Sequence, residues 1–164
     1  MDEARFWSMI EDAWNSAGGK VKARAKLAAG KLAEEKAAEL QEALDDDVVP
    51  ALEAQLRRLS ADELLAFDRV LERKLYAIDR AEVQEHTDGS DDGFLYARGF
   101  IVAAGRGYYD AVDATPSVAL MNLECEEMCF LSTNVYQEKY GELPASEISR
   151  GSHSNAAGWP DGVS

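Results

Sequence analysis

The sequence has few of the residues that metal, disulfide and nucleophilic sites usually need. Only two cysteines occur among 164 residues, Cys125 and Cys129, and only two histidines, His86 and His153. Cysteines four apart on a helix would share one face, but this spacing alone supports neither a zinc site nor a disulfide framework. We therefore expect both thiols to be small, buried, apolar side chains.

The scarcity of histidine also argues against nucleophilic catalysis. A triad of Ser90, His86 and Asp88 would have to form inside one short loop, and the sequence has no nucleophile-elbow motif. It also has neither a phosphate-binding loop nor a dinucleotide fingerprint.

Long apolar runs and an excess of positive charge are missing as well. No stretch is long enough to cross a membrane, and the acidic start of the chain is unlike a secretory signal, so we expect a cytoplasmic protein. Lysine and arginine number 17 against 31 acidic residues, for a net charge of −14. Nucleic acids and anionic membranes need a cationic surface, so we expect neither as a partner. This charge favours solubility, with binding of a basic protein or a cation as the alternative.

The alternating pattern of β-strands is also absent, and helix formers dominate the first half of the chain. The expected fold is all-α: a single helical bundle domain of five to six helices over residues 1–141. A Ser-, Gly- and Pro-rich segment, 142–164, is predicted to be a flexible, mostly disordered tail. Trp159 is unusual in such a tail and is expected to dock back or onto a partner.

Helical spacing of apolar residues predicts where the helices and their buried faces lie. The predicted helices cover 2–16, 20–45, 48–59, 61–82, 94–112 and 117–140, with a break or kink at Gly30. Buried stripes are predicted at Phe6, Met9, Ile10, Ala13 and Trp14, and at Leu64, Phe67, Val70 or Leu71, Leu75 and Ile78.

Several polar residues predict helix ends or surface positions. Ser60 and Glu63 have the spacing of a capping box, and Ser117 is expected to cap the last helix. The aspartates at 45–47 are expected to form a turn, and Asp79 to lie on the helix surface.

The stretch HTDGSDDGF, residues 86–94, combines turn residues with carboxylates. Ser90 is well placed to cap a helix, and Asp91 and Asp92 would fall in its first turn, where negative charge is favourable. Asp88 and Gly89 form a good turn pair. A capped helix start explains the whole stretch, although the charge density exceeds what a cap needs.

A second acidic stretch, LECEEMC, covers residues 123–129. Glu124 and Glu127 would share a helix face, with Glu126 rotated away. If that face meets the aspartates of SDDGF, four carboxylates converge and need Arg98, Arg69 or a metal such as Mg²⁺, Ca²⁺ or Mn²⁺. We predict that Arg98 is buried or half-buried and pairs with one of these four carboxylates.

The segments LLAFDRVLERKLY, GSDDGFLYARGFIVAAGR and ECEEMCFLSTNVYQEKYGELP together resemble a bacterial domain-of-unknown-function family, number 4240, common in actinomycetes. The resemblance covers about residues 3–143. Its most specific element is SDDGF followed by Tyr96, Arg98 and Gly105. This chain departs from the family in having the polar DRAEVQEHTDG before that element and Phe100 in place of a tryptophan. The resemblance implies no activity.

These observations favour a binding or accessory module that uses the surface around SDDGF to hold another protein or a small molecule. The alternative is a metal-assisted enzyme, for example in a biosynthetic pathway, with the Asp/Glu cluster as ligands. No cofactor is expected, with a divalent cation as the alternative. The candidate binding residues are Ser90, Asp91, Asp92, Phe94, Tyr96, Arg98, Glu124 and Glu127.

Overall fold

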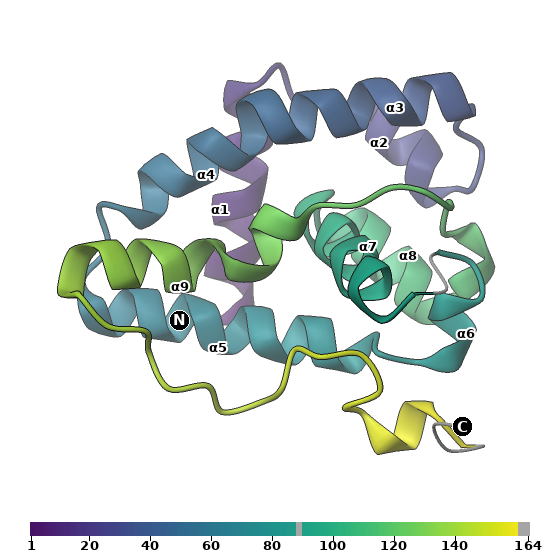
Figure 1. Cartoon of the computed structure of the whole chain (residues 1–164). Helices are drawn as coiled ribbons and strands as arrows, with labels where there is room; N and C mark the ends of the chain where they lie inside the picture. Colours follow the sequence, from purple (N-terminus) through teal and green to yellow (C-terminus); the bar gives the residue numbers. More distant parts are fainter. Residues whose placement is uncertain (88–89, 161–164) are drawn as a thin grey trace.

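The computed structural model describes residues 1–87 and 90–160, and the regular elements among these residues are all helical, as predicted (Figure 1). None of the helices in the described part combines the length and apolarity needed to span a membrane. The α-helices are α1 (Glu3–Ser16), α2 (Val21–Ala28), α3 (Glu34–Ala43), α4 (Val49–Leu56), α5 (Ala61–Ala77), α6 (Ala81–Gln84), α7 (Asp91–Ala103), α8 (Arg106–Ala114) and α9 (Glu126–Tyr140).

The predicted core stripes are confirmed in the two helices that define them most clearly. Every residue of both stripes is buried, in α1 and in α5 together with Ile78, which directly follows α5. The capping box at the start of α5 is also present: the Ser60 hydroxyl accepts from the Glu63 N–H, and the Glu63 carboxylate accepts from the Ser60 N–H. Apolar periodicity and capping therefore fixed these helices from local sequence alone.

The predicted number of five to six helices is too low because three predicted helices are divided. One of them is the 61–82 helix, which ends as α5 at Ala77 and is followed by the separate α6. The 20–45 helix separates into α2 and α3 at Gly30, the predicted break, which has a φ of +68°. The 94–112 helix separates into α7 and α8 at Gly105, with a φ of +105°. Positive φ is accessible to glycine at little cost, so the chain turns at these points and places α8 against α2.

The turn predicted at 45–47 is wrong. Residues Leu44–Val48 form a π-helical turn that joins α3 to α4 without interruption, seen as the long arc of Figure 1. Leu44 and Val48 are almost fully buried at the two ends of this turn. Burial of these side chains outweighs the poor helix propensity of three aspartates, which remain exposed on the outer side.

The predicted cap at Ser117 is also wrong. Pro116–Val118 form one 3-10 turn, the chain then runs without regular structure, and α9 begins only after Cys125. The Cys125 N–H donates to the Tyr96 carbonyl of α7 at 2.9 Å. This long-range hydrogen bond connects the start of α9 to α7, and no local sequence pattern predicts it.

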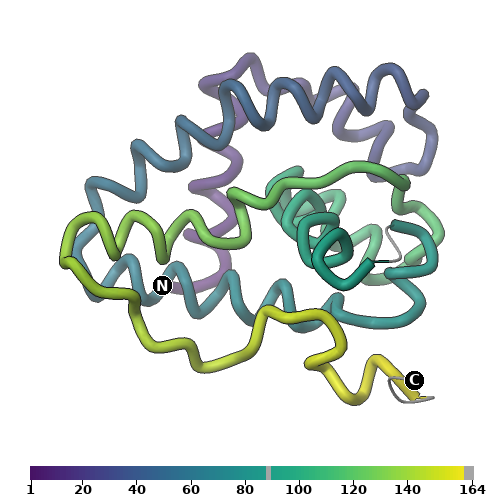
Figure 2. Tube along the Cα trace, viewed as in Figure 1, coloured from purple at the N-terminus to yellow at the C-terminus, as the bar shows by residue number. Residues whose placement is uncertain are grey.

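After α9 the chain turns back at Gly141 and runs beside α5, which both views of the backbone show (Figures 1 and 2). We call residues 142–160 the return segment. The sequence predicts a disordered tail here, but the described part of this segment is bound to α5, α7 and α9 by side-chain and main-chain hydrogen bonds. Residues 161–164 of the predicted tail lie outside the described residues.

Candidate functional site

The return segment surrounds the Asp79 carboxylate, which follows α5 and is 0% exposed. Asp79 Oδ2 accepts from the N–H groups of Ser154 and Asn155 at 2.7 and 2.9 Å, and Oδ1 accepts from the His153 N–H at 3.0 Å. The Trp159 indole N–H adds a fourth bond at 3.2 Å. The positive φ of His153 turns successive N–H groups toward one acceptor, an arrangement typical of anion binding. The prediction that Asp79 decorates the surface is therefore wrong.

A second buried group of charges lies further toward the start of α5. Asp68 is 2% exposed and Glu72 is 0% exposed. Arg150 of the return segment places Nη2 at 2.6 Å from both Asp68 oxygens and at 3.4 Å from Glu72 Oε1. Arg69 supplies another cation, with Nη1 at 3.1 Å from Glu72 Oε2. The Asp68 carboxylate also accepts from the Ser132 hydroxyl of α9 at 2.6 Å.

Arg98 is 0% exposed, as predicted, but its predicted carboxylate partner is wrong. Its Nη1 donates to the Leu75 carbonyl at 2.8 Å, and its Nη2 donates to the Arg150 carbonyl at 3.0 Å and to the Ser152 hydroxyl at 3.2 Å. Within the described ranges, no ion pair includes Arg98. Burial lowers the pKa of this guanidinium, and the nearby Asp79 charge partly offsets that effect. The groups that accept hydrogen bonds from Arg98 thus lie on α5 and on the return segment. The prediction had placed them on the two acidic stretches.

The start of α7 contacts the same segment. Ser90 caps this helix as predicted, accepting from the Gly93 N–H at 3.1 Å. The Asp91 carbonyl accepts from the Ser152 hydroxyl at 2.6 Å, and Asp91 Oδ1 lies 3.4 Å from His153 Nδ1. Phe94 is buried, with its ring centroid 6.0 Å from that of Trp159 in an edge-on arrangement. Trp159 therefore docks back onto its own domain. The predicted turn pair at 88–89 lies outside the described residues.

The two acidic stretches meet at one point, through the glutamate expected to be rotated away. Interaction with the Glu126 carboxylate raises the pKa of the Tyr96 hydroxyl. The charge of Asp92 acts on the same hydroxyl in the same direction. The four carboxylates that were expected to converge do not do so, because Glu124 and Glu127 lie near Asp45 instead.

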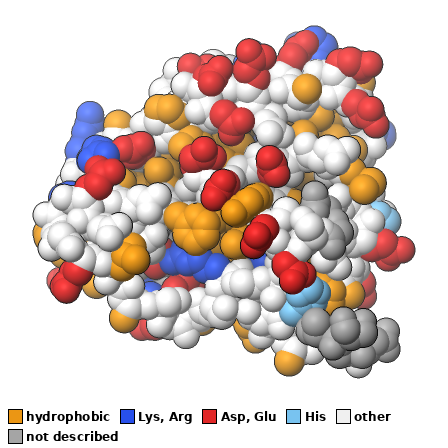
Figure 3. All heavy atoms as spheres, in the orientation of Figure 1, with side chains coloured by type: hydrophobic (Ala, Val, Ile, Leu, Met, Phe, Trp, Pro, Cys, Tyr) orange, Lys and Arg blue, Asp and Glu red, His pale blue; other side chains and the backbone are white. Residues whose placement is uncertain are grey.

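That neighbour is the π-helical turn. Among the described residues, Asp45, Cys125 and Glu127 form one group whose potential ligand atoms all lie within 4.8 Å of one another. Partial desolvation by neighbouring side chains, and then the Glu127 charge, raise the pKa of the exposed Asp45, and the Glu124 charge acts in the same direction. Acidic side chains are spread across this face of the molecule, over α3 and toward its centre (Figure 3). This group of potential metal ligands differs from the predicted one, which joined Glu124 and Glu127 to the aspartates of SDDGF.

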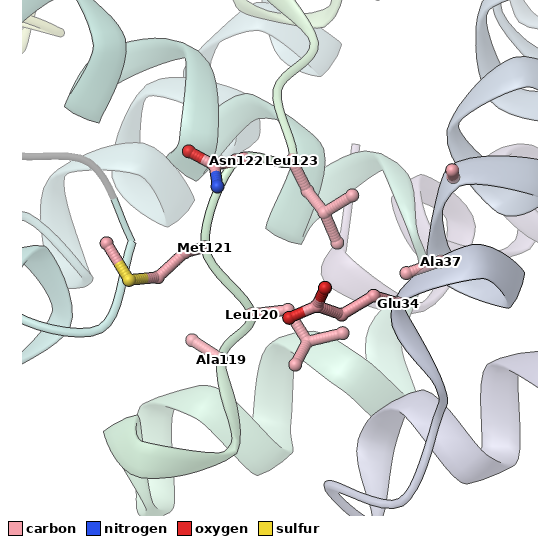
Figure 4. Close-up of a pocket in the computed structure, with 8 residues that line it drawn as sticks. Glu34, Ala37, Ala119, Leu120, Met121, Asn122 and Leu123 are labelled. Atoms are coloured by element: carbon pink, nitrogen blue, oxygen red, sulfur yellow. The ribbon is translucent and has the colours of Figure 1, made fainter.

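A cavity of about 430 Å³ lies between α3 and the loop that leads to α9. Figure 4 shows Leu120 and Leu123 on the side of the loop that faces Glu34 and Ala37, whereas Met121 points away. None of the predicted site residues lines this cavity. Its walls are mostly alanine and leucine, without a buried charged side chain among the residues that line it.

The buried carboxylates of Asp68, Glu72 and Asp79 were not among the predicted site residues, and Asp79 was expected on the helix surface. Asp68 lies four residues after Leu64, Glu72 four after Asp68, and Asp79 four after Leu75, so all three fall on the apolar stripe. A charged residue at a core position of a helix is a signal for a buried partner, since unpaired buried charge is costly. That partner could not be found from α5 alone, because Arg150 is 82 residues away from Asp68.

These contacts define an all-helical protein in which a face rich in buried charges is covered by the chain's own C-terminal segment. We call this face the docking face. It consists of Asp68 and Glu72 of α5, Asp79 directly after α5, Asp91, Phe94 and Arg98 of α7, and Cys129 and Ser132 of α9. A family model described as "Protein of unknown function (DUF4240)" matches residues 1–138, and the chain belongs to that family. No curated protein and no solved structure matched the chain. The family match contains the whole docking face and ends before the return segment.

Proposed function

We propose that this chain is a binding module whose docking face holds an extended polypeptide segment, and that its own return segment occupies that face. One observation supports the proposal above all: the buried charged residues lie inside the family match, but several of the groups that bind them lie outside it. Asp68, Asp79 and Arg98 lie inside the family match, whereas Arg150 and the N–H groups that bind Asp79 lie beyond it.

The energetics support an occupied face more than a face built only for stability. Burial of an ionised group costs several kcal/mol unless hydrogen bonds and opposite charge offset it, and apolar residues of similar volume often stabilise a core as well or better. Here many of the offsetting groups come from a segment whose one regular element among the described residues is the 3-10 turn Ala156–Gly158. Buried charges of this kind favour a role in recognition, where they select the occupant.

The contacts also resemble the way in which proteins bind peptides. Asp79 binds main-chain N–H groups, which any non-proline residue would offer. Side-chain selection comes from the two ends, where Arg150 meets Asp68 and Trp159 meets Phe94. Main-chain bonds that give affinity and side-chain contacts that give specificity are the usual division in peptide recognition. The natural partner in this proposal is another protein, with neither nucleic acid nor membrane involved.

The proposal is tested by cutting the covalent link between the domain and its segment. A protease site inserted at the exposed residues 142–143 allows the full chain to be folded first and cleaved afterwards. We expect the cleaved segment to remain bound during gel filtration at high concentration and to exchange with an added synthetic peptide of residues 142–160. A peptide with Gly158→Ala is the matched control, because a Cβ there would lie 2.5 Å from the Asp79 carbonyl oxygen. Loss of the domain's fold on cleavage, with no rebinding of the peptide, would contradict the proposal.

A metal-assisted enzyme is the second candidate, favoured by the group of Asp45, Cys125 and Glu127. A cation there would offset the desolvation and the neighbouring negative charges that raise the pKa of Asp45. Against it, burial raises the pKa of the Cys125 thiol, whereas a metal ligand must be the thiolate. Melting curves with EDTA and with added Mg²⁺, Mn²⁺ or Zn²⁺ separate the candidates. The binding module keeps one midpoint throughout, while the enzyme predicts a saturable rise that Asp45→Asn removes.

A further inference from the structure

The docking face binds Arg150 through two groups that accept hydrogen bonds from different directions. Nη2 meets the Asp68 carboxylate, and Nη1 donates to the Cys129 carbonyl of α9 at 2.7 Å. The Arg150 side chain is 10% exposed in this position. We infer that Asp68, Glu72, Ser132 and the Cys129 carbonyl form an arginine site, which recognises a guanidinium group of a partner polypeptide once the return segment is displaced. This inference rests on the proposed function and names the chemistry of the occupant.

The geometry favours guanidinium over the ammonium group of lysine. A guanidinium carries its donors on a rigid planar fork, so two of its nitrogens can serve acceptors on separate helices at the same time. Here those acceptors are on α5 and α9. A lysine has one nitrogen, which could satisfy the Asp68 carboxylate or the Cys129 carbonyl in good geometry but would leave the other weakly bound.

The charge of the site also requires a cation from the occupant. Asp68 and Glu72 supply two carboxylates, and Arg69 supplies the one cation that the domain itself contributes to their ion pairs in the described residues. Without Arg150, one negative charge of this nearly buried group is uncompensated. The Ser132 hydroxyl donates to Asp68 Oδ1 and so orients the carboxylate, but it adds no charge.

The rest of the segment sets the spacing of the partner. Trp159 follows Arg150 by nine residues and packs edge-on against Phe94, while the N–H groups at 153–155 meet Asp79 between these two side chains. Gly158 passes so close to the main chain at residues 79 and 80 that a Cβ there would require a shift. The expected partner therefore carries an arginine, then a short turn of mostly small residues, then glycine and an aromatic residue.

The full chain with Arg150→Ala and Gly158→Ala is suited to the test, because both changes weaken its own segment and neither alters the docking face. Three labelled peptides of residues 145–160 are then titrated by fluorescence anisotropy, with arginine, lysine or citrulline at position 150. Citrulline has nearly the shape of arginine and no charge. We expect the arginine peptide to bind at least about tenfold more tightly than the other two, a difference of about 1.4 kcal/mol. Circular dichroism verifies that the double variant is folded.

The outcomes distinguish this inference from the function on which it rests. Equal binding of the three peptides would overturn the arginine site while leaving a peptide-binding face. Failure of all three, with the variant folded, would overturn both. Adding Asp68→Asn to the double variant provides a second readout: the preference for arginine over citrulline should disappear. A preference that survives this change would also overturn the site.

Discussion

Arg150 Nη2 lies 2.6 Å from each carboxylate oxygen of Asp68, a residue 82 positions earlier in the chain. Both side chains are nearly withdrawn from water, at 10% and 2% exposure. Because charges in such surroundings are weakly screened, their interaction is strong and the loss of one partner is costly. This pair therefore connects the stability of the fold to the occupancy of the docking face.

Arg150→Met should destabilise the protein by roughly 3 kcal/mol, because it leaves the Asp68 carboxylate buried with less compensation. Asp68→Asn should also destabilise, and the double variant should lose clearly less than the sum of both losses. Urea unfolding of the four proteins measures this coupling. Arg73→Met, an exposed position on the same helix as Asp68, is the control and should change stability by no more than about 0.5 kcal/mol. Additive losses would mean that the pair contributes nothing beyond its separate side chains.

Substitution of Gly99 in α7 tests the close packing of α7 against α9, and Gly107 in α8 provides the matched control. A Cβ at Gly99 would lie 2.4 Å from the Cys125 carbonyl oxygen and 2.6 Å from Cys129 Sγ, so Gly99→Ala should cost about 1–3 kcal/mol. A Cβ at Gly107 would meet nothing within 4 Å. Gly107→Ala should therefore be neutral or stabilise by up to about 1 kcal/mol, since glycine is the poorer helix former. Thermal melts of the two variants compare them directly, and equal effects would refute this account of the helix contact.

Local patterns predicted the helices well where burial and propensity agree. Apolar spacing located α1 and α5, and the serine–glutamate pair located the start of α5. The π-helical turn was missed because buried Leu44 and Val48 override three poor helix formers. The start of α9 was missed because its determinant is a hydrogen bond to the Tyr96 carbonyl of another helix.

The site was predictable only in part, for the same physical reason. The capped start of α7 follows from local sequence, and the burial of Arg98 was predicted correctly but for carboxylate partners that it does not have among the described residues. The partners of Arg98 do not follow from local sequence, because they belong to α5 and to a segment whose composition is typical of disorder. Long-range contacts of buried charged residues hold the return segment in place and determine where the site lies. Such contacts produce no local sequence pattern from which they could be predicted.

Both cysteines should be unreactive in the folded protein. Burial raises the pKa of the Cys129 thiol to about 12 and also raises that of Cys125, so the nucleophilic thiolate is scarce at pH 8. Ellman's reagent should find no fast thiol in the native protein and two after unfolding in urea. A thiol that reacts in the native state at the rate of a free cysteine would contradict the packing of α7 against α9.

The capping box makes a specific prediction for stability against pH. The Ser60 N–H, and then Arg5, lower the pKa of Glu63 from 4.5 to about 2. Because the folded pKa is the lower one, the stabilising contribution is complete above about pH 4.5 and is lost as the pH falls toward 2. Glu63→Gln should therefore lower the melting midpoint near pH 6 and have a shrinking effect as the solution is acidified toward pH 2. A difference that stays constant across this range would show that the carboxylate charge has no part in the cap.

Hydrogen exchange of the amides of His153, Ser154 and Asn155 tests most directly whether the return segment is a displaceable occupant. These N–H groups donate to Asp79, so they exchange only when the segment leaves the docking face. In the same sample, the amides of Leu71 and Leu75 in the core of α5 report the opening of the whole domain. The account predicts protection of the three segment amides with an opening free energy clearly below that of the α5 amides and with a weak dependence on urea. Equal opening free energies and equal urea dependence in both sets would mean that the segment leaves only when the domain unfolds, which would contradict a binding face.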